Sequence, residues 1–379
     1  MTRTPLLFAV ALDGAGWHPA AWREADARPD RLTTPGYWTA LVVAAERGGV
    51  DFVTIEDSMT IQTTDPHRVR GRMDAVQVAA RVAPATSHIG LVPTVTVTHT
   101  EPFHTSRAIA TLDLISRGRA GWSPRTAALH ETALFGRRGA ASVEESLTEA
   151  ADYVEVVREL WDSWEDDAVI QDGATGRFVD ADRLHHIDFH GRWFDVKGPS
   201  VVARPPQGQP LVCVCAPDDD GVRLAARTAD VVFATPADRT RARQVVDRVR
   251  AAQGDASREN EEIHVFADLT VFLDVEPGRA RERRSRLDDL GGPCPTDAKT
   301  VAGTPAELAD LMHEWRTVGL AGFRLRPAAL PHDLDQICGP LVAELRRRGM
   351  FPNARPAETL RGRLGLPRPG SRYTRGGTT

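Results

Sequence analysis

The chain is poor in three features that mark large protein classes: cysteine, long apolar runs and an excess of basic residues. Four cysteines among 379 residues are too few for a disulfide framework, so we expect a reduced, cytoplasmic protein. No apolar run approaches the roughly 20 residues of a membrane helix. Leu6 to Leu12 is too short for a signal peptide. With 47 basic and 52 acidic residues the net charge is −5, which argues against a nucleic-acid surface.

The stretch from His88 to Trp122 predicts strand, loop, helix and strand in close succession. Residues 89–97 are β-branched and apolar, which is typical of a buried strand. Glu101-Pro102 opens a helix that ends at Arg117-Gly118, and a second strand begins at Ala120. Two strands joined by a crossover helix are the unit of a parallel α/β sheet.

The same alternation runs almost from end to end and predicts eight strands, each followed by a helix. The expected strands are residues 7–12, 52–55, 89–97, a short one from 120, 210–215, 231–234, 264–275 and 322–325. Eight such repeats predict an α/β fold, a (β/α)8 TIM barrel over residues 1–350.

Three segments do not fit the repeat. Residues 165–209, rich in Asp, Gly and His, and residues 277–299 interrupt it, and we expect both to form loops over the barrel mouth. Residues 351–379 are rich in Arg and Pro, which predicts an extended C-terminal arm on the surface.

Several longer segments also resemble a known family. They are GWHPAAWR, LDLISRGRAGW, LWDSWEDDA, HHIDFHGRWFDVKGP, VAGTPAELAD and LRGRLGLPRP. In this order they resemble bacterial-luciferase-like flavin monooxygenases, in the branch of nitrilotriacetate and dibenzothiophene-sulfone monooxygenases. The resemblance implies the same barrel and an FMN-dependent monooxygenase. Such an enzyme would take reduced FMN from a separate reductase and use O2 on a small organic substrate. It also implies a homodimer or larger homo-oligomer.

Four residues are candidates for cofactor binding. The resemblance places Asp57 and Thr94 near the flavin and Trp122 in the wall of its pocket. Arg125 is the fourth candidate, as an anion contact, because a guanidinium can bind a phosphate. From the residues alone, Asp57 could equally be a helix cap, and β-propensity explains Thr94 as well. If the barrel is correct, Asp57, Thr94, Trp122 and Cys215 share the carboxyl-terminal edge of the strands.

Three further residues are candidates for substrate binding: Trp17, His18 and His99. Trp17 and His18 follow the first strand, where indole and imidazole rings suit either a pocket wall or a packed loop. The histidines at 185, 186 and 190 lack a completing set of cysteines or carboxylates, so we predict no metal site. No catalytic acid or base can be assigned.

The chain departs from the family where the flavin phosphate is usually held. The family's histidine, tyrosine and serine correspond here to Val143, Leu147 and Asp218, and Asp218 is followed by Asp219 and Asp220. These carboxylates could instead cap a helix, and Arg125, Arg137 or Arg223 could supply a cation. We therefore predict weak FMN binding. Two alternatives remain open: a deazaflavin-dependent oxidoreductase, and a non-enzymatic binding or assembly protein.

Overall fold

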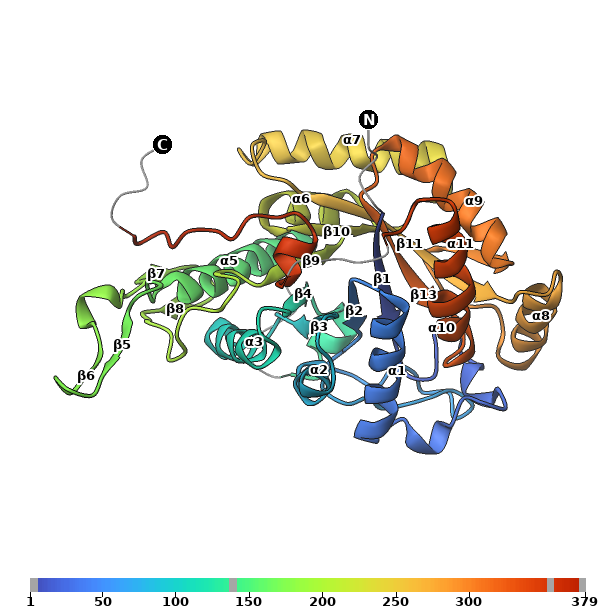
Figure 1. Ribbon diagram of the computed structural model, residues 1–379, viewed down its shortest axis with the longest axis horizontal. Coiled ribbons are helices and arrows are strands. Elements are labelled where there is room, and N and C mark those ends of the chain that lie inside the picture. The colour runs from blue at the N-terminus through green and yellow to red at the C-terminus, as the bar shows by residue number, and fades with distance from the viewer. Residues whose placement is uncertain (1–5, 136–141, 353–357, 375–379) are drawn as a thin grey trace.

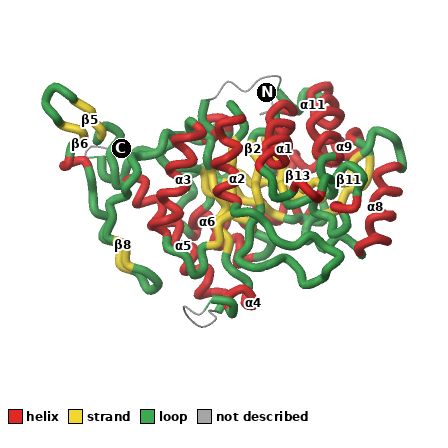
Figure 2. The backbone as a smooth tube through the Cα atoms, turned by 90° about the horizontal axis from the view of Figure 1, so that it is seen from below, coloured by secondary structure: helices red, strands yellow, loops and turns green. Residues whose placement is uncertain are grey.

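The computed structural model describes residues 6–135, 142–352 and 358–374, which form a closed barrel of parallel strands with helices outside (Figures 1 and 2). The eight barrel strands are β1 (Leu7–Leu12), β2 (Phe52–Ile55), β3 (Gly90–Thr96), β4 (Gly121–Arg125), β9 (Leu211–Cys215), β10 (Val231–Ala234), β11 (His264–Leu273) and β13 (Gly322–Pro327). Each pairs with its neighbours in sequence, and β13 closes the barrel on β1. The predicted (β/α)8 barrel is confirmed.

The strands are buried on both faces, as their apolar sequences predict. All ten residues of β11 and all six of β1 are buried, because one face meets the helices and the other lines the lumen. The surrounding helices are α1 (Pro35–Gly48), α2 (Ala75–Val82), α3 (Pro102–Ser116), α5 (Val143–Asp162), α6 (Asp219–Thr228), α7 (Arg239–Asp255), α9 (Pro305–Trp315), and α10 (His332–Gln336), which continues through a π-helical turn into α11 (Val342–Arg347). None of the helices in the described ranges is long and apolar enough to cross a membrane.

The two interruptions have more regular structure than the loops that the sequence predicts. Residues 165–209 contain two antiparallel hairpins that project from the barrel on the side of α5 (Figures 1 and 2). Their strands are β5 (Val169–Asp172), β6 (Arg177–Val179), β7 (Phe189–His190) and β8 (Asp195–Val196). Residues 277–299 contain α8 (Arg279–Gly291), and a further strand, β12 (Lys299–Gly303), pairs with β11. Because α8 buries only Ala280, Arg283 and Leu287, its sequence lacks a clear apolar stripe and predicts a loop.

The C-terminal segment is not a surface arm where it crosses the barrel. The short helix α12 (Leu360–Arg363) and the residues after it close the amino-terminal end of the strands. Leu360, Leu364 and Leu366 are buried against the first residues of the strands, including Leu7 and Phe52. Gly90 leaves the space that Leu360 fills, since a Cβ at this position would lie 2.6 Å from a Leu360 methyl group. The prediction of an exposed arm is wrong for this part.

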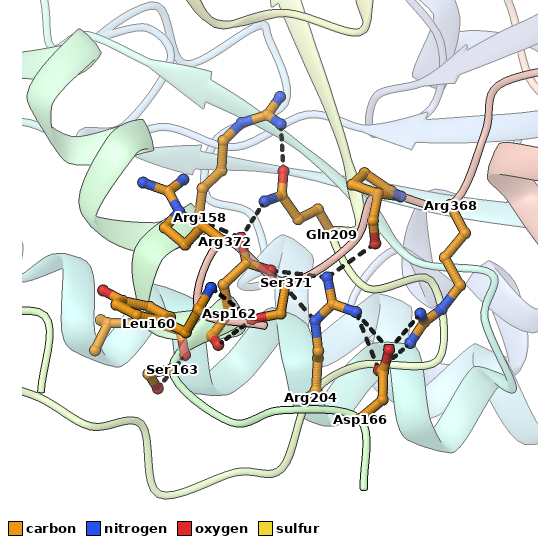
Figure 3. A network of polar contacts seen from close by, with 12 residues as sticks. Arg158, Leu160, Asp162, Ser163, Asp166, Arg204, Gln209, Arg368, Ser371 and Arg372 are labelled. Atoms are coloured by element: carbon orange, nitrogen blue, oxygen red, sulfur yellow. Dashed lines mark hydrogen bonds and ion pairs between the residues drawn. The ribbon is translucent and has the colours of Figure 1, made fainter. Parts of the chain in front are cut away.

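Ion pairs hold residues 368–372 of the arm against α5 and the residues that follow it (Figure 3). Arg204 donates to Asp162 at 2.9 Å and to Asp166 at 3.0 Å. From the arm, Arg368 donates to Asp166 at 2.9 Å, and Arg372 donates to Asp162 at 3.3 Å. The hydrogen bond from Arg368 lowers the pKa of Asp166 to about 2. Arg368 and Arg372, two of the arginines that suggested a solvated tail, therefore have carboxylate partners.

Candidate active site at the barrel mouth

The lumen changes from apolar to polar toward the carboxyl-terminal ends of the strands, which we call the mouth. Because side chains alternate along a strand, every second residue points inward. The inward residues of the amino-terminal half are apolar: Leu7, Ala9, Phe52, Val92, Leu211, Val231, Phe233 and Phe266, with Cys213 among them. One step further they become Thr54, Thr94, Ser123, Cys215, Asp268 and Arg324. The barrel thus has a packed lower half and a polar upper half.

A buried charge network forms the floor of the polar half. Asp268 accepts hydrogen bonds from Arg324 Nε at 2.8 Å and from Arg326 Nε at 3.0 Å. The Arg324 guanidinium lies over the Phe233 ring, 3.8 Å from its centroid. Burial raises the pKa of Asp268, but the charges of the two arginines outweigh it, so the net shift is downward. The floor therefore stays charged and fixed.

The lumen above this floor is open. The Cys215 side chain is exposed although it ends a strand inside the barrel, with its Sγ 3.6 Å from Arg324 Nη2. Thr94 is buried on the lumen face of β3, opposite Ser123. The predicted placement of Cys215 and Thr94 at the carboxyl-terminal half of the lumen agrees with the structure.

Beside the lumen, a cavity of about 210 Å³ is walled by tryptophans. The indole N–H groups of Trp17, Trp22 and Trp38 donate to main-chain carbonyls at 2.9, 3.0 and 2.9 Å, respectively. The rings are therefore fixed and present apolar faces. Glu56 and Trp17 join the cavity to the floor: a Glu56 carboxylate oxygen lies 3.7 Å from Arg324, and the Trp17 ring lies 4.6 Å from the Arg326 guanidinium.

The cavity also holds a carboxyl group that titrates near neutral pH. Asp13, directly after β1, accepts bonds from Arg72 Nη2 at 3.0 and 3.1 Å. Burial raises the pKa of Asp13 to about 6, although Arg72 opposes the shift, while Glu56 adds to it. Sequence patterns did not single out Asp13, because one aspartate after a strand is common.

His18 and His99, two of the predicted substrate-binding residues, are placed firmly by the fold. His18 lines the cavity, but its Nδ1 accepts from Ala20 N–H at 3.1 Å and its Nε2 lies 3.1 Å from Asp288. Burial lowers the His18 pKa despite Asp288, so the ring acts as a wall. His99 follows β3 with a φ of 65°, and its ring centroid lies 6.0 Å from that of Phe135.

The predicted cofactor residues lie in different surroundings. Asp57 accepts from Ala75 N–H at 2.9 Å and therefore caps α2, the simpler of its two interpretations. Trp122 is fully buried outside the lumen, with its ring centroid 6.2 Å from that of Tyr153 on α5. The prediction that Trp122 shares the mouth is wrong, because it points outward while Ser123 points inward. Arg125 is at the mouth, but its Nη2 donates to the buried Glu131 at 2.8 Å.

The positions that correspond to the family's phosphate ligands remain unsuited to an anion. Val143 is 60% exposed at the start of α5, and Leu147 packs against the core. Asp218 caps α6 by accepting from Gly221 N–H at 2.8 Å. Arg223 pairs with Asp220, and Arg137 lies outside the described residues.

The three histidines of the 165–209 segment have separate partners. His185 lies 2.8 Å from Glu165, His186 bonds the Gly198 carbonyl at 2.8 Å, and His190 lies 3.2 Å from Asp195. Within residues 6–135, 142–352 and 358–374, no three His, Cys, Asp or Glu side chains are arranged to hold a metal ion.

The charge network of the floor was missed by sequence reasoning. Its signal was present, since Arg324 and Arg326 alternate with apolar residues in β13, and Asp268 lies in the apolar strand β11. Charged residues spaced by two within buried strands indicate side chains that point into a lumen.

Comparison with known proteins agrees with this geometry. The family model for luciferase-like monooxygenases matches residues 15–322. N-acetyl-S-(2-succino)cysteine monooxygenase of Bacillus subtilis (strain 168) is 31% identical, covering 97% of this chain and 98% of its own. Nitrilotriacetate monooxygenase component A of Aminobacter aminovorans is 30% identical, covering 94% and 95%. The EDTA monooxygenase (EmoA) from Chelativorans sp. BNC1 shares the fold, with a TM-score of 0.85 at 24% identity over 96% of this chain and 99% of that one.

Proposed function

The chain belongs to the luciferase-like monooxygenase family, and we propose that it is an FMN-dependent monooxygenase supplied with reduced FMN by a separate reductase. The observation that carries the proposal is the open lumen at Cys215, joined through Glu56 to the tryptophan-walled cavity. The family match confirms the resemblance drawn from the sequence. When bound, reduced FMN would supply the electrons that activate O2.

The residues of the lumen fit the ring end of a flavin. The Cys215 thiol is exposed at this depth of the barrel beside the Arg324 guanidinium, and Thr94 points into the same lumen from β3. In this proposal Thr94 and Cys215 contact the ring, and the rigid floor of Arg324, Asp268 and Arg326 fixes its depth.

The tryptophan-walled cavity would hold the substrate. Its volume of about 210 Å³ and its apolar walls suit a small organic molecule, which Trp17 and His18 would orient. In this proposal the tryptophan rings also exclude water from the reacting atoms. Asp13 is the carboxyl group of this cavity able to hold a proton near neutral pH.

Titration of the purified protein with oxidised and reduced FMN, followed by flavin fluorescence or absorbance, tests the proposal. We expect binding of both forms, with the reduced form bound more tightly because the floor carries two arginines. Failure of both forms to bind would contradict it. That result would favour the second candidate, a relative that uses the fold for binding or assembly, which Val143, Leu147 and Asp218 make plausible on physical grounds.

We further propose that the protein is a homodimer or larger homo-oligomer, since symmetric dimers are the commonest soluble assembly. Light scattering at micromolar concentration should give at least twice the chain mass of 41.4 kDa. A mass equal to one chain would contradict this expectation.

A further inference from the structure

Five of the described helix N-termini around the mouth, those of α2, α5, α6, α7 and α9, are occupied by the chain's own side chains. In a (β/α)8 barrel these N-termini are the usual phosphate sites, because their free N–H groups and positive dipole ends face the mouth. Here the caps are Asp57 and Asp74 on α2, Ser142 with Glu145 on α5, Asp218 on α6, Asp238 on α7, and Thr304 with Glu307 on α9. Most of these caps are carboxylates, and those on α5 and α6, where the family's phosphate positions lie, would repel a phosphate.

The N-terminus of α6 shows the strongest opposition. Asp218 occupies the Gly221 N–H, and Asp219 and Asp220 lie in the same turn. Two neighbouring arginines of the described residues are already paired, because Arg248 binds Asp219 and Arg223 binds Asp220. A phosphate placed here would meet the charge of Asp218 and an N–H group that already has an acceptor.

The start of α5 offers no better site. Ser142 and Glu145 satisfy each other's main-chain N–H groups at 3.1 and 3.0 Å, and the exposed Val143 side chain lies between them in sequence. Arg125, the nearest predicted anion contact, is held by Glu131, which is only 1% exposed. Burial raises the pKa of Glu131, but the hydrogen bonds from Arg125 and Ala128 N–H, together with the charge of Arg125, outweigh it, so the net shift is downward. A phosphate bound by Arg125 would therefore have to compete with Glu131 for the Nη2 group.

Unlike the capped helix ends, the lumen is open to a ligand: Cys215 is exposed there, and Thr94 and Arg324 line it. A flavin has a ring that suits the lumen and a terminal phosphate that would reach the capped helix ends. We propose that the site holds a flavin by its ring and ribityl chain without gain from the phosphate, so that it binds riboflavin at least as readily as FMN. This inference rests on the proposed function, because it requires that the lumen takes a flavin.

Parallel titrations of the full chain with riboflavin and with FMN, read by quenching of flavin fluorescence, test the inference. We expect the two dissociation constants to agree within about threefold, or riboflavin to bind more tightly. An FMN affinity more than about thirtyfold higher would overturn the inference and leave the proposed function standing. Binding of neither flavin would overturn both.

Salt gives an independent readout of the phosphate. Repulsion between Asp218 and the phosphate is screened as ionic strength rises. FMN affinity should therefore stay constant or increase between low and high salt, and riboflavin affinity should not change. A loss of FMN affinity at high salt would show that a cation of the protein holds the phosphate, which overturns the inference.

The variant Asp218→Ser tests the cause directly, with Asp238→Ser as the matched control. Both substitutions replace an N-cap aspartate by a serine, on neighbouring helices, so they perturb helix capping alike. Asp218→Ser should tighten FMN binding about tenfold and leave riboflavin unchanged, because it removes one like charge near the phosphate. Asp238→Ser should alter neither affinity. Equal changes for both flavins in Asp218→Ser would overturn the assignment.

Discussion

The two ends of this barrel differ in packing: the amino-terminal end is closed, and the carboxyl-terminal end is open. At the amino-terminal end, Leu360 and Leu364 are buried among the first residues of the strands, and Arg361 pairs with the buried Asp230 at 3.1 Å. At the mouth, the Cys215 side chain is exposed inside the lumen, and a cavity lies beside it. One end thus satisfies its apolar and charged groups internally, and the other leaves room for ligands.

This difference assigns stability and function to opposite ends of the barrel. In (β/α)8 barrels the amino-terminal face contributes to stability and the carboxyl-terminal face carries the active site. Here a C-terminal segment far away in sequence completes the amino-terminal face. Substitutions at this end should therefore lower the free energy of unfolding with little effect on binding, and substitutions at the mouth should mostly do the reverse.

The largest effect is expected from Arg361→Ala at the amino-terminal end. Arg361 is 6% exposed and donates to the Gln209 and Pro367 carbonyls as well as to Asp230. Its removal leaves a buried carboxylate with one arginine fewer, which costs about 3–5 kcal/mol for such pairs. Urea denaturation measures the loss. Arg68→Ala at the mouth is the control and should cost less than about 1 kcal/mol, since the Arg68 side chain is 35% exposed. Equal losses of unfolding free energy in the two variants would contradict the difference between the two ends.

The next largest effect is expected from Leu364→Ala, which removes part of the closing surface without touching a charge. Leu364 is 3% exposed, and deletion of a buried leucine side chain costs about 2–4 kcal/mol through lost burial and the remaining cavity. Leu134→Ala near the mouth should cost less than about 0.5 kcal/mol, because Leu134 is 62% exposed. A neutral Leu364→Ala would show that the C-terminal segment merely covers the barrel.

The contrast between the ends also explains what the sequence could predict. Strands such as β1 and β11 follow from apolar, β-branched runs, because both of their faces are buried. The closing segment could not be predicted in the same way. Its leucines stand among arginines and prolines, and only tertiary structure supplies Asp230 and Asp166 as partners for Arg361 and Arg368.

The candidate site shows the same limit. The sequence predicts which residues end the strands, but the direction of each side chain depends on register. Trp122 was placed in the pocket on the resemblance, whereas alternation from Ser123 directs it outward. Arg324, Arg326 and Asp268 were overlooked, although their spacing within buried strands indicates the lumen. Carboxylates of Asp57 and Asp218 cap helices, as their simpler interpretation predicts.

Arg125→Ala tests whether a mouth residue can serve stability instead of binding. Arg125 forms an ion pair with Glu131. Removing Arg125 leaves a buried carboxylate without its cation, which should lower the free energy of unfolding by about 1–3 kcal/mol. Flavin affinity should hardly change. The double variant Arg125→Ala with Glu131→Gln should recover part of the stability, since the buried charge is gone. A large loss of FMN affinity, with little loss of stability, would restore Arg125 as a phosphate contact.

The smallest expected effect compares two carboxyl groups by their pH dependence. Burial raises the pKa of Asp13 at the mouth to about 6, whereas at the amino-terminal end burial of Asp230 is outweighed by Arg361 and Arg158, which lower its pKa to about 2. For Asp13 the folded state binds the proton more tightly than the unfolded state, so stability falls as pH rises from about 4 to about 6. For Asp230 the sign is opposite, and stability falls only as pH drops below about 4.

Asp13→Asn should therefore remove part of the decline in unfolding free energy between pH 4.5 and pH 7, measured by urea denaturation at each pH. We expect about 1 kcal/mol, well below the full value of the shift, because 28% of the Asp13 side chain is exposed and water screens its charge. Asp230→Asn should leave this window unchanged, whatever it does to overall stability. If both variants reduce the decline in unfolding free energy between pH 4.5 and pH 7, the two ends do not differ in their electrostatics. The difference between them would then lie in side-chain packing alone.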